Sequence, residues 1–587
     1  MRNGGNVMKK IMNQADTFVY ELCNGIAMTN PDVVSDLKYK VIRKREIDQE
    51  KVTLISGGGS GHEPAHAGFV GKGMLDAAIC GDVFASPTQI QVYKGISETK
   101  SKKGTLLIIK NYSGDIMNFK NGAALAADEG AEVEYVIVND DIAVKDSLYT
   151  VGRRGVAGTV LVHKVAGAAA EMGLDLKGVK EAAQDAVNAT KSIGFALSSC
   201  TVPAKGEPTF EISDGEMEYG VGIHGEPGIK REAAVSCDEI AGRMTEDLLA
   251  SLEMDKDTEQ ELAVLVNGFG GTPLQELYVL ANAVRKKLAS CQNVQVYRSF
   301  VGNYMTSIDM MGASLTFMKL NDTLKKYLDY PSMAPGFRVD GPVSCIPYTD
   351  VELAVSEKGK FITEEEWGKI EKKKISLNNI RYMTAEMGRY IIEKESYFCE
   401  IDSFAGDGDF GASVAKGFKQ LQNEWPHLMQ EDTIGGFLKA GGMIIVEYCG
   451  GASGPIWGSA FLGAASEVGA KKEISLKEFA DMMQAAVRNI QKTGQRSFGK
   501  GAEVGDKTLI DALVPYADTL SSMEKESIAE AFEKATAAAE TGAQKTAKIV
   551  ARMGRAGVVG ERSLGHPDAG ALALGMIFRH ITGKLHS

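Results

Sequence analysis

The chain has 587 residues, which at about 150 residues per domain predicts two to four domains and excludes a small disulfide-stapled protein. Hydrophobic residues make up 44% and charged residues 24%, as in ordinary globular proteins, so a disordered chain is also excluded. The 65 basic and 77 acidic residues give a formal net charge of −12 without long blocks of either sign. This balance argues against a nucleic-acid partner and favours a small-molecule partner.

The eight cysteines are widely spaced and form no CxxC pair, so we predict reduced core thiols in a cytoplasmic protein. The N-terminal segment is charged and polar where a signal peptide needs an apolar stretch. No run approaches the roughly 18 apolar residues of a membrane helix, so neither secretion nor a membrane partner is expected.

The first part of the chain alternates short β-branched runs with alanine-rich helical segments, which is typical of an α/β domain. The runs predict strands over residues 51–56, 105–111, 133–140, 158–164, 262–268 and 294–302.

The second part reads differently, because amphipathic segments follow one another without strands. They predict helices over residues 380–394, 410–422, 475–492, 527–553 and 571–581. Residues 334–374, with three prolines and a charge-rich stretch, are interpreted as a linker. The chain therefore predicts an α/β domain over residues 1–333 and an all-α domain over residues 375–587.

A glycine-rich segment at residues 57–61 follows the first predicted strand, and we interpret it as a turn whose backbone N–H groups can reach a ligand. A dinucleotide fingerprint started at Gly59 meets Pro64 where its last glycine should stand. His62 and His66 have the spacing of two zinc ligands on a helix, but Pro64 disfavours that helix. A structural turn and an acid/base role for the histidines both remain open.

Two further polar residues are candidates for chemistry on a ligand. Asp115 follows the second predicted strand and is expected on a loop at the strand's carboxyl end, where open α/β sheets bind ligands. His224 lies between glycines, with room for a substrate beside its ring, and a neutral imidazole can attack a carbonyl carbon. A turn role for Asp115 and a structural role for His224 are the alternatives.

In the second part, Asp402, Asp407 and Asp409 have the spacing D-x4-D-x-D, with glycines that let the chain curl between them. Three carboxylates at one point are costly unless a hard cation lies among them, and Mg²⁺ is held by few carboxylates plus substrate phosphates. A calcium loop is disfavoured, because its sixth and twelfth positions would be Ala412 and Phe418. A metal-free Asp/Gly turn is the alternative.

Three later segments suit a phosphate ligand. Residues 450–459 form a second small-residue turn, and residues 505–513 indicate a helix start. Arg555 and Arg562 offer positive charge, although surface arginines are common.

Several motifs together resemble the dihydroxyacetone kinase family. Residues 57–88, 110–119 and 222–228 resemble its substrate domain, and residues 402–411, 450–455, 505–513 and 560–568 resemble its nucleotide domain. The resemblance implies an ATP-dependent kinase that converts dihydroxyacetone to dihydroxyacetone phosphate. It also implies an α/β substrate domain of two subdomains, a barrel of antiparallel helices for ATP, and a homodimer.

The resemblance further implies roles for residues of the substrate domain. His224 would bond covalently to the carbonyl carbon of the substrate as a hemiaminal. His62 and Asp115 would be the acid/base pair, with Gly58, Gly59 and Lys110 close to the substrate.

In the nucleotide domain, the resemblance implies that Asp402, Asp407 and Asp409 hold two Mg²⁺ ions that bridge the ATP phosphates. The implied ATP contacts are Gly450, Gly451, Ala452, Ser453, Gly454, Asp506, Lys507, Thr508 and Arg555.

The sequence departs from the family pattern at Phe410, Gly557 and Ala569, which bears on nucleotide affinity and substrate choice. Because the covalent step needs only a carbonyl group, a kinase for erythrulose or glyceraldehyde is an alternative. A ketone-binding co-regulator is another, and the acidic residues of the second domain argue against it. Met8 is the expected natural start.

Overall fold

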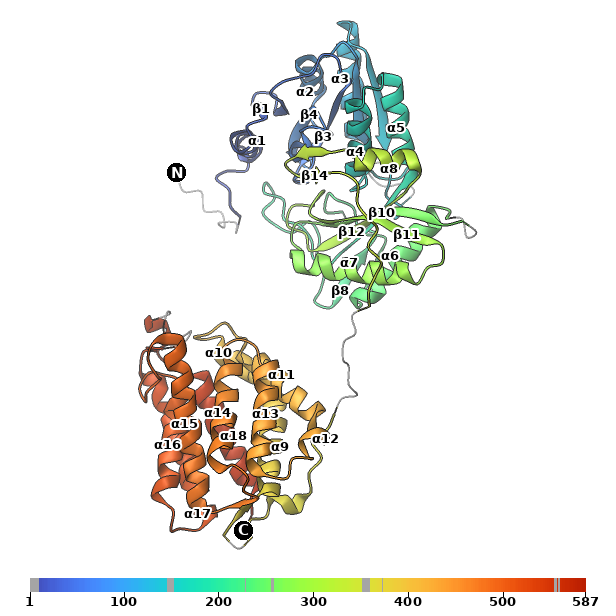
Figure 1. Cartoon of the computed structure of the whole chain (residues 1–587). Coiled ribbons are helices and arrows are strands. Elements are labelled where there is room, and N and C mark those ends of the chain that lie inside the picture. The colour runs from blue at the N-terminus through green and yellow to red at the C-terminus, as the bar shows by residue number, and fades with distance from the viewer. Residues whose placement is uncertain are drawn as a thin grey trace. The chain divides into compact units, whose positions relative to one another are not determined.

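The protein is described here from a computed structural model, which covers residues 10–144, 152–226, 228–254, 258–350, 359–371, 373–553, 557 and 560–586. The chain forms two compact units, Met1–Val351 and Glu352–Ser587 (Figure 1). Their boundary falls within the residues interpreted as a linker.

The first sheet of the α/β unit has six strands in the order β1-β2-β4-β3-β5-β6. Strands β3 to β6 run parallel, and β1 and β2 pair in antiparallel fashion at one edge. The elements are β1 (Val33–Asp36), β2 (Val41–Lys44), β3 (Thr53–Ser60), β4 (Ala77–Val83), β5 (Thr105–Lys110), β6 (Val133–Val138), and helices α1 (Phe18–Thr29), α2 (Gln89–Glu98) and α3 (Ser113–Asp128).

Successive side chains of this sheet point to opposite faces, as the two-residue period of a strand requires. Leu107 and Ile109 of β5 pack with α2 and α3. Leu106 and Ile108 pack on the other face with α4 (Thr159–Glu171) and α5 (Leu176–Ala189). Both faces are covered, which explains the continuous apolar runs of the parallel strands.

The second sheet also has six strands, in the order β11-β10-β12-β7-β8-β9, of which only β10 and β11 pair in parallel. Helices α6 and α7 cover one face. The other face shares a core with α4 and α5, so these two helices lie between the sheets. The elements are β7 (Thr190–Ala196), β8 (Glu216–Tyr219), β9 (Lys230–Ala233), α6 (Cys237–Ser251), β10 (Gln260–Gly268), α7 (Leu274–Ala289), β11 (Val294–Gly302), β12 (Gly312–Lys319), α8 (Asp322–Asp329), β13 (Ser332–Ala334) and β14 (Phe337–Val339).

Two of the predicted elements of this unit are wrong. Residues 158–164 form the start of α4 rather than a strand, because the helix is buried all round between two sheets and so lacks the polar face that marks most helices. The glycines at 57–59 belong to β3 rather than to a turn. A Cβ atom at Gly57 would lie 2.3 Å from the carbonyl oxygen of Ile79, so the bare backbone lets β4 approach.

The second unit is helical, as predicted, and its main helices form a closed ring. Each of α9, α11, α13, α14, α15, α16, α17 and α18 packs against the next in this order, and α18 packs against α9. The elements are β15 (Ile375–Ser376), α9 (Leu377–Glu393), α10 (Glu395–Asp402), α11 (Phe410–Asn423), α12 (Trp425–Leu428), α13 (Ile434–Tyr448), α14 (Ser453–Val468), β16 (Glu473–Ile474), α15 (Leu476–Phe498), α16 (Ile510–Ser522), α17 (Ile528–Lys545) and α18 (Ala569–Lys584).

The sequence missed α13 and α14 because both are rich in glycine. At Gly458 a Cβ atom would lie 2.2 Å from a methyl group of Val446, so glycine allows these helices to pack closely. The predicted helix over 527–553 is also too long, because α17 ends at Lys545. Beyond it, the backbone turns to other partners, and the Arg552 N–H donates to the carbonyl of Asp506 (3.1 Å).

Two further predictions concern membrane-spanning helices and the state of the cysteines. Within the described part of the chain, no helix is long and apolar enough to cross a membrane. All eight cysteines are free, as predicted, but only four are core thiols, Cys23, Cys80, Cys200 and Cys449. Cys237, Cys291 and Cys399 are half-buried, and Cys345 is exposed.

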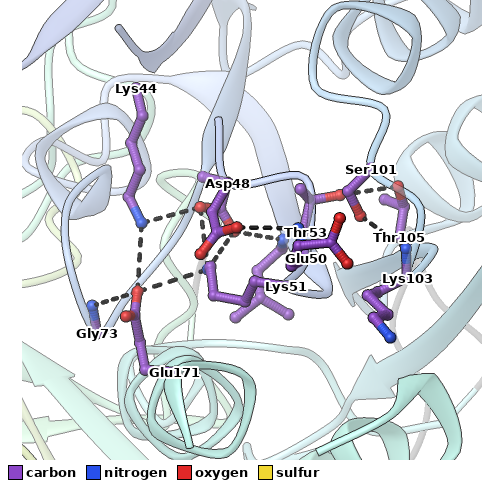
Figure 2. A network of polar contacts seen from close by, with 12 residues as sticks. Lys44, Asp48, Glu50, Lys51, Thr53, Gly73, Ser101, Lys103, Thr105 and Glu171 are labelled. Carbon is purple, nitrogen blue, oxygen red and sulfur yellow. Dashed lines mark hydrogen bonds and ion pairs between the residues drawn. The ribbon is translucent and has the colours of Figure 1, made fainter. Parts of the chain in front are cut away.

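A buried ionic network joins one end of strands β2, β3 and β4 to α4. Asp76 accepts hydrogen bonds from Lys44 (2.8 Å), Lys51 (3.0 Å) and the backbone N–H of Leu54 (2.8 Å). Both lysines also face Glu171, at 3.6 and 3.5 Å. Figure 2 shows Lys44, Lys51 and Glu171 directed toward one another. Burial alone would raise the pKa of Asp76, but the two lysines hold it below its usual value.

We expect Asp76→Asn to lower the free energy of unfolding of the α/β unit by about 3 kcal/mol, because it leaves the two lysines with only the more distant carboxylate of Glu171. Urea unfolding followed by circular dichroism measures this change. The tryptophans, Trp367, Trp425 and Trp457, all lie in the second unit, so their fluorescence identifies that unit's transition. Glu50→Gln is the control, because Glu50 pairs with Lys102 at the exposed surface and should show no measurable change. Equal stability of the Asp76 variant would contradict the network's role.

Candidate active site

Four predicted site residues of the α/β unit come from separate elements and meet in one buried place. His62 follows β3, Lys110 ends β5, and Asp115 lies in the first turn of α3 rather than on a loop. His224 lies in the segment between β8 and β9, which belong to the second sheet. The site is therefore built from both sheets.

The two histidines are in direct ring contact. Their ring centroids are 4.8 Å apart, and the planes are nearly perpendicular, at 85°. Tyr112 packs edge-on against His224 (4.5 Å), and Phe84 contacts the rings of His62 (5.2 Å) and His224 (5.4 Å). These aromatic rings shield both imidazoles, of which His62 is buried and His224 is half-buried.

The hydrogen bonding of His62 determines which nitrogen can act as a base. Its Nδ1 lies 2.8 Å from the carbonyl oxygen of Thr306, which only accepts, so Nδ1 carries the proton. Among the described residues, Nε2 has no hydrogen-bond partner. Its lone pair is therefore available within the site.

Burial lowers the pKa of His62 well below its usual value, and the neighbouring Lys110 lowers it further. The pKa of His224 is lowered in the same way by burial and then by His62, Lys110 and Arg154. Both rings are therefore neutral at physiological pH, the state in which imidazole is a nucleophile or base.

Lys110 and Asp115 lie together against the bare backbone of Gly58. A Cβ atom there would lie 3.0 Å from Lys110 Nζ and 3.5 Å from an oxygen of Asp115. Asp115 accepts a hydrogen bond from Ser86 (2.5 Å), whereas Lys110 Nζ has no hydrogen-bond partner in the part of the chain described. Burial lowers the pKa of Lys110 and raises that of Asp115, so the two pKa values lie closer together than those of exposed side chains.

Gly59 and Gly61 leave room for Phe84, because neither carries a side chain. A Cβ atom at Gly59 would lie 2.8 Å from the Phe84 backbone, and one at Gly61 would lie 2.9 Å from its ring. Phe84 itself has a φ of 57°, a left-handed conformation that is costly for a bulky residue and that marks functional sites. The glycine-rich segment therefore holds the aromatic wall of the site as well as presenting Gly58.

His66, the other histidine of the segment, does not contact His224. It packs against His163 of α4, with ring centroids 5.3 Å apart. Both rings are fully buried, and burial lowers the pKa of His163 to about 3. The α/β unit thus encloses four neutral imidazoles, since His62 and His224 share this state.

These buried rings predict that the α/β unit loses stability as the pH falls. Unfolded histidine titrates near 6.5, so the stability is fully present above that pH and declines below it, by up to about 1.4 kcal/mol per pH unit for each ring. We expect His163→Leu to reduce the stability difference between pH 7 and pH 5.5 by about 1 kcal/mol. Urea unfolding at both pH values measures this, and an unchanged difference would contradict a neutral buried His163.

In the helical unit, the three aspartates converge as their spacing predicts. Asp402 is the last residue of α10, and Asp409 immediately precedes α11. One carboxylate oxygen from each of Asp402, Asp407 and Asp409 lies within 4.8 Å of the others. Burial raises the pKa of Asp402, and the neighbouring Asp407 and Asp409 raise it further. An all-carboxylate oxygen set at this separation fits a hard divalent cation.

The predicted phosphate turn lies beside these carboxylates. Ser413 of α11 donates a hydrogen bond to the carbonyl of Gly450 (2.7 Å), which ties the turn to the acidic segment. Residues 450–459 are only partly a turn. Helix α14 starts at Ser453, so residues 453–459 form the beginning of this helix. The cavity here has a volume of about 190 Å³ and is lined by Asp402, Asp409, Gly450, Gly451, Ala452, Ser453, Thr508 and Asp568, among others.

Other predicted ATP contacts have structural partners. The Lys507 ammonium donates to the carbonyls of Ile549 (3.2 Å), Ser563 (2.5 Å) and His566 (2.8 Å), although its side chain also lines the cavity. Asp506 accepts from the N–H of Glu503 (3.0 Å). A Cβ atom at Gly454 would meet the carbonyl of Cys449 at 2.4 Å, so its role is close packing. Arg555 lies outside the described residues.

Sequence reasoning missed Phe84, Tyr112 and Asp568. Asp568 caps α18 through the Ala571 N–H (2.7 Å), and burial raises its pKa to about 7. Tyr112 lies two residues after Lys110 in the same motif. Its position just after a predicted strand is the sequence signal that could have identified it as a site residue. For Phe84 the sequence offers no local signal, because its role depends on the close approach of Gly59 of β3 and of Gly61, which follows β3.

Comparison with known proteins connects both units to one family. The Dak1 domain matches residues 24–336, and the DAK2 domain matches residues 404–583. The L-erythrulose 1-kinase of Mycolicibacterium smegmatis is 33% identical over 97% of this chain and 99% of its own length. The triokinase/FMN cyclase of Rattus norvegicus is 34% identical over 99% of each chain.

Another relative matches about half of this chain, and a solved structure matches nearly all of it. The dihydroxyacetone-binding subunit DhaK of the PTS-dependent dihydroxyacetone kinase 1 of Listeria innocua is 50% identical over 55% of this chain and 97% of its own length. The crystal structure of the dihydroxyacetone kinase from C. freundii in complex with AMP-PNP and Mg²⁺ matches with a TM-score of 0.59 and 29% identity, over 98% of this chain and 100% of that one.

An α/β ligand unit followed by a helical unit with converging carboxylates defines a two-domain kinase. The chain belongs to the dihydroxyacetone kinase family, with the Dak1 and DAK2 domains fused in one chain. This confirms the resemblance and the fold class predicted from the sequence.

Proposed function

We propose that the protein transfers the γ-phosphoryl group of ATP to a hydroxyl group of dihydroxyacetone, forming ADP and dihydroxyacetone phosphate. The observation that carries this proposal is the contact between two neutral histidines, the half-buried His224 and the buried His62, beside the Lys110–Asp115 pair. A neutral imidazole next to a second imidazole with a free lone pair suits reversible addition to a carbonyl group.

In the proposed first step, a ring nitrogen of His224 bonds to the carbonyl carbon of the substrate. The carbonyl oxygen gains a proton, and the imidazole gives up its N–H proton, so the hemiaminal is neutral. His62 Nε2 is placed to carry this proton, because its ring contacts His224 and its Nδ1 proton is committed to Thr306. The tether selects carbonyl compounds over glycerol and holds the hydroxyl group in place for transfer.

In the second step, Asp115 accepts the proton of the hydroxyl group as it attacks the γ-phosphorus. Burial keeps the pKa of Asp115 raised, so the carboxylate binds a proton more readily than an exposed aspartate does. Lys110 stabilises the charge that develops close to the substrate, with Gly58 leaving space for the ligand between the two side chains.

In the helical unit, Asp402, Asp407 and Asp409 would hold Mg²⁺, two ions in this proposal, which when bound neutralise phosphate charge during transfer. Gly450, Gly451, Ala452, Ser453 and Thr508 line the cavity and are the proposed contacts to ATP. The N-terminus of α14 favours phosphate there. The relative crystallised with AMP-PNP and Mg²⁺ supports this assignment.

A kinase for a four-carbon ketose is the second candidate, because a relative that spans nearly the whole chain is named an L-erythrulose 1-kinase. Glyceraldehyde also has the carbonyl group that the tether requires. A co-regulator that only binds the ketone is less favoured, because the DAK2 domain and its three aspartates are present in the same chain. We propose a homodimer, which sedimentation equilibrium would test.

The experiment is to measure ADP release by the purified protein with Mg·ATP and, separately, dihydroxyacetone, D-erythrulose, L-erythrulose, glyceraldehyde and glycerol. Turnover on dihydroxyacetone and none on glycerol is the expected result. A preference for an erythrulose would change the substrate and keep the reaction. Absence of ADP release with every carbonyl compound would overturn the kinase assignment and favour the co-regulator.

A further inference from the structure

A single carboxylate, that of Glu226, supports the backbone of the His224 segment. One of its oxygens accepts a hydrogen bond from the backbone N–H of His224 (2.8 Å). The other accepts from Nη1 of Arg154 (3.0 Å). Glu226 therefore bridges the histidine's backbone and a guanidinium group.

Arg154 is itself fixed from several sides. It is 2% exposed, pairs with the buried carboxylate of Asp141 (2.7 Å) and donates to the carbonyl of Gly220 (2.9 Å). The backbone N–H of Asp141 also donates to the carbonyl of Arg154 (3.0 Å). Asp141 and the carbonyl of Gly220 therefore fix the position of the guanidinium group independently of Glu226.

The connection runs between the two sheets. Asp141 comes shortly after β6 of the first sheet, while Glu226 lies between β8 and β9 of the second. His62 follows β3 of the first sheet, Lys110 ends β5 and Asp115 lies in α3, which follows β5, whereas His224 lies between two strands of the second sheet. The Glu226–Arg154 pair therefore ties His224 to the part of the fold that carries its proposed partners.

The chain also leaves room for this pair. A Cβ atom at Gly222 would lie 1.7 Å from the Glu226 oxygen and 2.6 Å from Arg154 Nη1. Burying charges is costly, and a buried ion pair contributes little net stability compared with apolar packing. The glycine and the pair together are therefore better explained by the position of His224 than by stability.

We propose that Glu226 is a positioning residue that holds the His224 imidazole against His62 for covalent capture of the substrate. This inference rests on the proposed function, because it concerns the same histidine. Its consequence is that loss of the bridge impairs capture of the carbonyl compound and leaves the use of ATP unchanged.

The test compares Glu226→Gln with a matched control, Glu218→Gln. In Glu226→Gln, an amide NH2 replaces one acceptor oxygen, so either Arg154 or the His224 N–H loses its partner. Glu218 is a buried carboxylate of the same region that also joins an arginine (Arg231, 2.7 Å) to a backbone N–H (Gly228, 3.2 Å). The control thus makes the same chemical change in a similar bridge that does not hold His224.

The readout is ¹³C NMR of dihydroxyacetone labelled at its carbonyl carbon, bound to the full chain without nucleotide. Capture converts the ketone signal to that of a tetrahedral carbon. At a subsaturating ketose concentration, we expect Glu226→Gln to reduce the tetrahedral signal and the ketose kcat/KM about 10- to 100-fold. The KM for Mg·ATP should stay unchanged, and Glu218→Gln should match the wild type in every measurement.

A second variant, Gly222→Ala, displaces the carboxylate without altering any charge and should reproduce the loss. Wild-type levels of the tetrahedral signal in both variants would overturn the positioning role and leave the kinase assignment standing. A wild-type protein that turns over dihydroxyacetone without any tetrahedral signal would overturn the covalent step and this inference with it. Thermal melting of each variant verifies that the comparison is made on folded protein.

Discussion

His224→Ala is expected to reduce turnover of dihydroxyacetone by at least about a thousandfold, because the variant cannot tether the substrate and loses the gain from holding the hydroxyl group in place. The tetrahedral ¹³C signal of carbonyl-labelled dihydroxyacetone should disappear in the same variant. Binding of ATP analogues should be unchanged, since His224 belongs to the α/β unit and the proposed ATP contacts belong to the other. Steady-state assays of ADP release measure the loss.

The matched control for His224→Ala is His163→Leu. His163 is a buried histidine of the same unit, but its ring contacts are with His66 and Phe69 rather than with His224. This variant should retain turnover within a few-fold of the wild type. Comparable activity of His224→Ala and the wild type would exclude a covalent role for His224.

Asp407→Asn is expected to lower kcat by about a thousandfold while leaving capture of the ketose intact. The reason is that removing one charge from three converging carboxylates weakens the proposed Mg²⁺ site, where charge neutralisation provides most of the catalysis of phosphoryl transfer. The tetrahedral ¹³C signal should therefore persist without turnover. This outcome is the reverse of that for His224→Ala, so the two variants separate the two steps.

The Asp402 carboxylate also accepts the backbone N–H of Gly408 (2.9 Å), so Asp402→Asn would disturb the loop as well as the cation site. Asp432→Asn is the control, because Asp432 is an exposed aspartate of the same unit that pairs with Lys472. Binding of Mn²⁺, followed by electron paramagnetic resonance, should weaken only in the Asp407 variant. Full activity of Asp407→Asn would contradict the assignment.

The convergence of Asp402, Asp407 and Asp409 could be predicted because it is local. Few residues separate the carboxylates, and glycines let the chain turn between them, so proximity follows from spacing alone. The amphipathic helices of the second unit were predictable for a related reason, since each buries one face against its neighbours and the pattern repeats along the helix. The glycine-rich α13 and α14 were missed because close packing, not periodicity, determines their composition.

The sequence by itself determined the α/β and all-α character of the two parts, several of their strands and helices, and the acidic cluster. All of these depend on periodicities or spacings within one short segment. The motifs also carried the family resemblance, because their order along the chain is a property of the sequence.

Tertiary structure alone decided that residues 158–164 are helical, that Phe84 closes over His62, and that Glu226 reaches Arg154. In each case the deciding contacts join segments far apart in the sequence. An apolar run suits a buried helix as well as a buried strand, and a glutamate suits any cation or N–H within reach. In the folded protein, two sheets pack around α4. This packing determines which conformation the apolar run adopts and which partner the glutamate contacts.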